Sequence, residues 1–62
     1  MSTLVIDTAT DRTSVGIFKD GAEIFYAFHD GAMAHGEALP KLVAEALKVE
    51  PNISKVVVGM GP

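Results

Sequence analysis

The chain has 62 residues, of which 48% are hydrophobic, and its eight acidic and five basic residues give a formal net charge of −3. This length allows at most one small domain, which alone would be marginally stable. The hydrophobic fraction argues against disorder, the scattered basic residues argue against a grip on nucleic acid, and no cysteine is present for a disulfide scaffold. The N-terminus has no signal-peptide pattern and its apolar run is too short to span a membrane, so we expect a cytoplasmic protein without membrane contact.

Three strands are predicted in the first half, over residues 4–8, 13–19 and 22–29. Asp20-Gly21, between the second and the third, favours a two-residue type I′ hairpin, because both central positions of that turn need a positive φ. The third strand carries apolar residues on both faces, and we therefore expect a sheet that is covered on both sides.

A helix over residues 34–48 follows, because its apolar residues recur at three- and four-residue spacing. Pro40 conflicts with an uninterrupted helix, so the helix either starts or kinks there. A last strand over residues 55–59 contains Val56-Val57-Val58, which is typical of a parallel strand buried on both faces. The order is βββαβ, an α/β unit. We expect it to be incomplete, with an apolar sheet face left uncovered.

Asp7 ends the first strand, at the sheet edge where α/β folds commonly place ligands. The turn after it has the geometry of the phosphate-handling loop of actin-like ATPases and sugar kinases, and of ribonuclease-H-like nucleases. Active members usually carry glycine directly after this aspartate, whereas this chain has Thr8. We therefore interpret Asp7, Thr8 and Thr10 as a vestigial phosphate loop that hydrogen-bonds its own turn. Gly59 and Gly61 would permit a sharp turn or a close approach to a ligand, or only end a strand.

Five short motifs cover the whole chain: Ile6-Asp7-Thr8-Ala9-Thr10, Ser14-Val15, Asp20-Gly21, His35 with Leu39-Pro40, and Gly59-Met60-Gly61-Pro62. In this order and spacing, the chain resembles the N-terminus of the TsaB (YeaZ) family, glycoprotease-like paralogues of TsaD. The resemblance implies the first part of the N-terminal lobe of an actin-like ATPase fold, within a longer protein.

The TsaB family takes part in threonylcarbamoyl transfer to adenosine 37 of tRNA. TsaB is an accessory subunit that pairs with the catalytic subunit TsaD, and TsaE adds ATPase activity. The resemblance therefore implies a non-catalytic scaffold that reaches tRNA only indirectly. It also implies no cofactor in this segment, with ATP and metal on the partner subunits. Family members also form homodimers, so pairing with a second copy is the alternative to pairing with TsaD.

The helix carries the other candidate residues. The related catalytic subunit has a His-x-x-x-His pair here that grips a metal, but the position four residues after His35 is Leu39. We therefore expect neither a metal site nor a catalytic residue. Small residues and Met33 at the helix start suit a helix-to-helix interface. We expect Met33, His35, Ala38 and Leu39 to form the pairing surface.

Three other functions remain as alternatives. An ATP-dependent phosphotransferase or ATPase would place Asp7 and Thr10 at the phosphates. A metal-dependent hydrolase of the glycoprotease type is disfavoured by the missing second histidine. A ribonuclease-H-like nuclease needs several carboxylates around two metals, and we expect that Glu23 and Glu37 do not meet Asp7.

Overall fold

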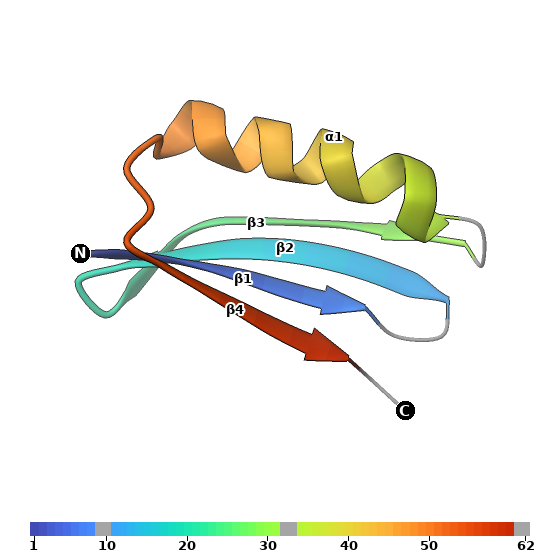
Figure 1. Cartoon of the computed structure of the whole chain (residues 1–62), viewed down its shortest axis with the longest axis horizontal. Coiled ribbons are helices and arrows are strands. Elements are labelled where there is room, and N and C mark those ends of the chain that lie inside the picture. Colours follow the sequence, from blue (N-terminus) through green and yellow to red (C-terminus); the bar gives the residue numbers. More distant parts are fainter. Residues whose placement is uncertain (9–10, 32–33, 61–62) are drawn as a thin grey trace.

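The computed structural model describes residues 1–8, 11–31 and 34–60, without the side chains of Ala34, His35, Glu37 and Met60. The elements follow in the order β1 (Ser2–Thr8), β2 (Arg12–Lys19), β3 (Ala22–Asp30), α1 (Ala34–Val49) and β4 (Lys55–Met60). Figure 1 shows one helix layered over one sheet. The chain is therefore a small mixed α/β domain, and the predicted order of elements is confirmed. The first strand begins at Ser2 rather than at residue 4, because the ladder with β2 continues to the pair Ser2–Lys19.

The four strands form one sheet in the order β3-β2-β1-β4. β1, β2 and β3 pair antiparallel in sequence, whereas β4 lies parallel to β1. The helix thus carries the chain from one edge of the sheet, at β3, to the opposite edge, at β4 (Figure 1). Parallel strands need a crossover connection of this kind. The predicted parallel placement of the last strand is confirmed.

The turn between β2 and β3 has the conformation expected of a type I′ hairpin. Asp20 has a φ of 52° and Gly21 a φ of 84°, so both central residues lie in the left-handed region. The Met1 ammonium group lies 3.2 Å from the Asp20 carboxylate. Just past the turn, the pairing of β3 shifts between Ile17 and Phe18 of β2, which is a β-bulge. The predicted hairpin is confirmed, whereas the β-bulge beside it was not predicted from the sequence.

One face of the sheet packs against α1 and forms the core. Val15 and Ile17 of β2 are fully buried, and Leu42 and Ala46 of α1 lie against them. The helix runs over β2 and β3. It is continuous through Pro40, whose ring is exposed, so the expectation that the helix starts there is wrong. The apolar stripe at three- and four-residue spacing is the face that meets the sheet.

The opposite face of the sheet is not covered by any described residue. Tyr26 is 53% exposed there, and Phe18 and Phe28 are exposed beside it. On β4, Val57 is exposed on this same face. Val56 and Val58 lie on the face that packs against α1, where they are still 56% and 59% exposed. The expectation that this chain leaves an apolar sheet face uncovered is therefore confirmed. Among the described residues nothing covers the second face of the sheet or both faces of the last strand, because the helix lies over β2 and β3 and β4 is last in the strand order.

Polar contacts fix the segment between α1 and β4 to the sheet. The buried Glu50 carboxylate accepts hydrogen bonds from Lys19 Nζ at 2.8 Å and from the Asn52 amide at 3.1 Å. The Lys19 contact, and then the Asn52 amide, hold the pKa of Glu50 below its ordinary value, and Glu50 raises the pKa of Lys19. Ser54 Oγ donates to the Ser2 carbonyl at 2.9 Å. These contacts set where β4 begins beside β1.

Candidate functional site

Asp7 lies at the carboxyl end of β1, directly beside Gly59 of β4. The parallel register pairs these two residues, which come from opposite ends of the chain. A Cβ atom placed on Gly59 would lie 3.6 Å from Asp7 Oδ1. The glycine therefore leaves one side of the exposed carboxylate open. The structure brings together two of the residues that the sequence singled out separately.

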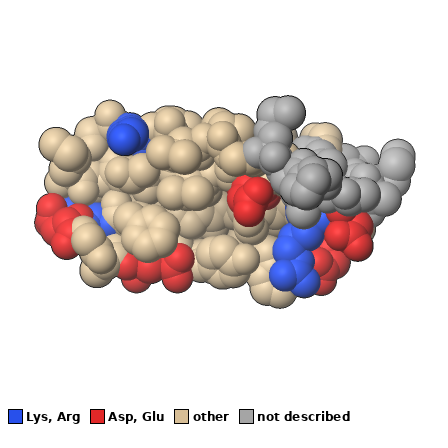
Figure 2. All heavy atoms as spheres, turned by 90° about the horizontal axis from the view of Figure 1, so that it is seen from below, with Lys and Arg blue, Asp and Glu red and all other residues tan. Residues whose placement is uncertain are grey.

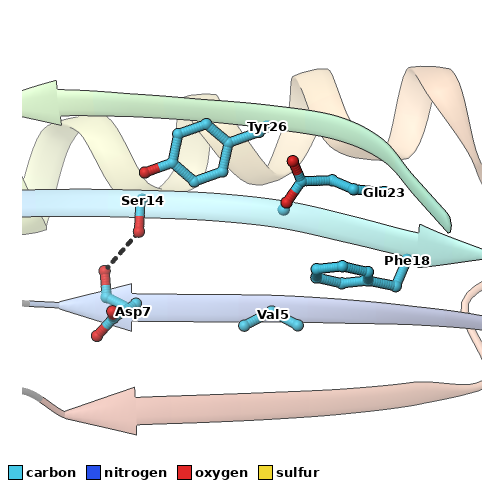
Figure 3. A pocket seen from close by; sticks show the side chains of 7 residues that line it. Val5, Asp7, Ser14, Phe18, Glu23 and Tyr26 are labelled. Atoms are coloured by element: carbon cyan, nitrogen blue, oxygen red, sulfur yellow. Dashed lines mark hydrogen bonds between the residues drawn. The ribbon is translucent and has the colours of Figure 1, made fainter. Parts of the chain in front are cut away.

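Asp7 also borders a hollow of about 220 Å³ on the face of the sheet away from α1. Figure 3 shows side chains from three neighbouring strands around it, and the residues that line it are Val5, Asp7, Ser14, Gly16, Phe18, Glu23 and Tyr26. The Ser14 hydroxyl donates to the backbone carbonyl of Asp7 at 3.4 Å, which ties the end of β1 to β2. The floor is apolar and two carboxylates border it.

Gly16 makes room for this hollow. A Cβ atom there would lie 3.4 Å from the Phe25 carbonyl oxygen and 3.6 Å from Tyr26 Cδ1. A side chain would extend from that crowded position over the floor of the hollow. No local pattern in the sequence marks this role, because a glycine within a strand does not reveal its neighbours on adjacent strands.

Glu23 and Asp7 line the same hollow but lie apart in it, with Tyr26 and Ser14 nearer to Asp7 (Figure 3). The β-bulge brings Glu23 opposite Phe18, on the same face as Asp7. The side chain of Glu37 lies outside the described residues. Across the parts of the chain that are described, no three His, Cys, Asp or Glu side chains group closely enough to hold a metal ion.

Only part of the predicted phosphate loop and of the predicted glycine turn lies within the described residues. Thr8 ends β1 and is half-buried, between Thr13 of β2 and Met60 of β4 in the ladders. Thr10 and Gly61 lie outside the described residues. The vestigial phosphate loop and the glycine turn therefore stay predictions, apart from the positions of Asp7, Thr8 and Gly59.

Only part of the predicted pairing surface on the helix lies within the described residues. Ala38 is buried, and Leu39 is half-buried and packs against the hydrophobic core. Met33 and the side chain of His35 lie outside the described residues. The pairing surface therefore stays a prediction, and its two described residues face the helix's own sheet.

Beyond the hollow, the uncovered face carries the aromatic rings of Tyr26 and Phe28 together with Arg12. The Arg12 guanidinium lies over the Phe28 ring, 4.6 Å from its centre, and Arg12 Nε donates to Asp30 at 2.7 Å. The Asp30 contact raises the pKa of Arg12. The Tyr26 and Phe28 rings are 6.1 Å apart. Figure 2 looks onto this face, where uncharged atoms cover most of the middle and most charged groups lie along the rim.

The geometry offers an exposed carboxylate at the carboxyl end of β1, the hydroxyl groups of Ser14 and Tyr26, and an apolar floor. These groups can hydrogen-bond a ligand or bind a cation, and the apolar floor can pack against another chain. Neither a scan against models of protein families nor a search of curated proteins finds a match for this sequence. No helix in the described part of the chain has the length and apolar character needed to cross a membrane.

Proposed function

We propose that the chain is the first part of the N-terminal lobe of a TsaB-family scaffold, with an actin-like ATPase fold. The observation that carries the proposal is the pairing of Asp7 with Gly59. These residues belong to the first and last of the five motifs through which the chain resembles that family. Their meeting on adjacent parallel strands supports treating the motifs as parts of one site.

The sheet topology also supports the proposal. Three antiparallel strands, a helix over them and a fourth strand parallel to the first form the βββαβ unit that the resemblance implies. The exposed aromatic side chains of the uncovered face fit a scaffold role, because large exposed apolar patches mark interaction surfaces.

As a scaffold, the protein pairs with TsaD in the cytoplasm and supports threonylcarbamoyl transfer to adenosine 37 of tRNA. TsaE completes the assembly. ATP and the catalytic metal bind to the partner subunits, and tRNA is contacted through them. Asp7 stabilises its own turn and takes no part in the chemistry.

The test is the threonylcarbamoyladenosine content of tRNA in cells depleted of this protein, measured by mass spectrometry of nucleosides. We expect a large loss of this nucleoside, with other modified nucleosides unchanged as the control. An unchanged content contradicts the proposal.

A nucleotide-dependent function is the second candidate, because the exposed Asp7 carboxylate lies where α/β folds bind phosphates. The variant Asp7→Asn separates the two. A scaffold carrying it restores the nucleoside in depleted cells, whereas an ATPase or phosphotransferase that needs the carboxylate does not.

A further inference from the structure

One part of the uncovered face already binds a cation of the chain itself. The Arg12 guanidinium lies over the Phe28 ring, and its Nε donates to Asp30. Arginine suits such a place, because its flat guanidinium stacks on an aromatic ring while it hydrogen-bonds a carboxylate. The neighbouring hollow has a ring and a carboxylate in the same relation, but no cation of the described residues between them.

In the hollow, the carboxylate and the ring meet over the position of Gly16. A Cβ atom there would lie 3.8 Å from Glu23 Oε2 and 3.6 Å from Tyr26 Cδ1. Figure 3 shows the Glu23 side chain between the rings of Tyr26 and Phe18. The space of about 220 Å³ is enough for a guanidinium group.

The basic residues of the described part of the chain do not reach this carboxylate. Neither Glu23 nor Asp7 takes part in an ion pair there. Lys55 lies on the same face, because it pairs with Thr3 in the ladder. However, β4 is three strands away from β3, or about 14 Å, and Asp7 lies four residues further along β1 than Thr3, or about 13 Å. The four-carbon stem of a lysine spans neither distance.

We propose that the hollow receives an arginine side chain from the part of the longer lobe that covers this face of the sheet. The inference rests on the proposed function, which makes this chain the first part of such a lobe. The guanidinium lies on the Tyr26 ring and donates to Glu23, as Arg12 does with Phe28 and Asp30.

Charge complementarity identifies the occupant. Two carboxylates, Asp7 and Glu23, line the hollow beside an apolar floor. A purely apolar segment laid over this face would bury both without a partner, which is unfavourable, whereas a cation compensates them. Arginine fits better than lysine, because two aromatic rings stand beside the Glu23 carboxylate and a flat group can stack on them.

An arginine probe tests the proposal on this chain alone. We expect that Nα-acetylarginine amide shifts the NMR signals of Gly16, Glu23 and Tyr26, and that Nα-acetylcitrulline amide, its uncharged analogue, binds about fivefold more weakly. Glu23→Gln weakens binding of the arginine probe by a similar factor. Glu45→Gln, the same change at an exposed position of α1, is the matched control and leaves binding unchanged.

The longer protein tests where the arginine comes from. There we expect Glu23→Gln to lower the thermal unfolding temperature by about 2–4 °C, because the arginine loses its partner, while Glu45→Gln has no such effect. The arginine probe no longer binds, because the hollow is filled. Neither measurement depends on the modified nucleosides of tRNA, so failure of this inference and failure of the proposed function are distinguishable.

Three results overturn the proposal. Equal binding of the two probes, or equal binding to the parent chain and to Glu23→Gln with an unchanged circular dichroism spectrum, shows that the carboxylate does not select a cation. A longer protein that still binds the arginine probe at Glu23 has no arginine of its own in the hollow. A longer protein that Glu23→Gln stabilises covers this face without a cation.

Discussion

The two faces of this sheet are built from alternating residues of the same strands, yet they differ in what they contact. Val15 and Ile17 point toward α1 and are fully buried, whereas Phe18 and Tyr26 point away and are exposed. The covered face holds the core that stabilises the chain. The uncovered face holds the Asp7 carboxylate and the hollow.

The comparison shows that burial follows the layer arrangement as well as the hydrophobicity of a strand. Tyr26 and Phe28 are as apolar as many core residues, but no described element lies over them. Folding free energy therefore comes mainly from one face, and the other is available for binding. Substitutions on the two faces test this division.

The largest effect is expected from Ile17→Ala. Ile17 is fully buried under α1, and removing such a side chain costs about 2–5 kcal/mol because a cavity remains. In a chain of this size that loss lowers the free energy of unfolding to near zero. Urea unfolding followed by circular dichroism, at a concentration that keeps the chain monomeric, measures it.

Phe18→Ala, one residue along the strand, is the matched control. Its side chain lies on the uncovered face, so we expect a cost of about 1 kcal/mol or less. Equal costs for the two substitutions would show that the uncovered face contributes as much to folding as the covered one.

A smaller effect is expected at two glycines, one in the hairpin and one in α1. Gly21→Ala in the hairpin lowers stability by about 1 kcal/mol, because a φ of 84° is unfavourable for a residue with a Cβ atom. Gly36→Ala raises it by about 0.5–1 kcal/mol, because Gly36 is exposed in α1 and alanine favours the helix. Thermal unfolding of both variants gives the two signs. A loss of stability in both variants would show that Gly36 does not weaken α1.

The smallest effect concerns pH and the segment that leads into β4. Because the pKa of Glu50 lies below its ordinary value of 4.5, its contribution to stability is present above that pH and is lost as pH falls through the folded pKa. The pKa of Lys19 is raised above 10.5, so its contribution is present below that pH and is lost only as pH rises through the folded pKa. The contribution of the Lys19–Glu50 pair to stability is therefore level between these limits.

Glu50→Gln should remove part of the acid-side loss and lower stability at neutral pH. The urea midpoint between about pH 3 and pH 7 measures both. Glu45→Gln, at an exposed position of α1, is the control and should keep the slope of the parent chain. If the two variants have the same slope, the Lys19–Glu50 contact does not hold this segment.

Much of the fold could be predicted from local patterns. The Asp20-Gly21 turn has the φ angles that its residues favour, and the helical spacing of Leu42 and Ala46 marks the face that meets the sheet. Coverage could not be predicted for Val56–Val58, because a run of valines indicates a strand but not how many neighbours it has. Pro40 was also uninformative, since it is tolerated on the exposed side of α1.

The candidate site was predictable residue by residue but not as an arrangement. Asp7 and Gly59 were each singled out, yet their contact depends on the register of two strands from opposite ends of the chain. Glu23 was set aside because it follows the hairpin directly, and the bulge that turns it toward the hollow has no local signature. The Lys19–Glu50 pair was missed for the same reason, since nothing near either residue reveals the other.

The central claim is that the covered face of the sheet supplies most of the free energy of folding, while the uncovered face supplies little of it. The free energies of unfolding of Ile17→Ala and Phe18→Ala in urea test it most directly. We predict a loss several times larger for Ile17→Ala, because Ile17 is fully buried under α1 whereas Phe18 is exposed. Equal losses for the two variants would contradict the account.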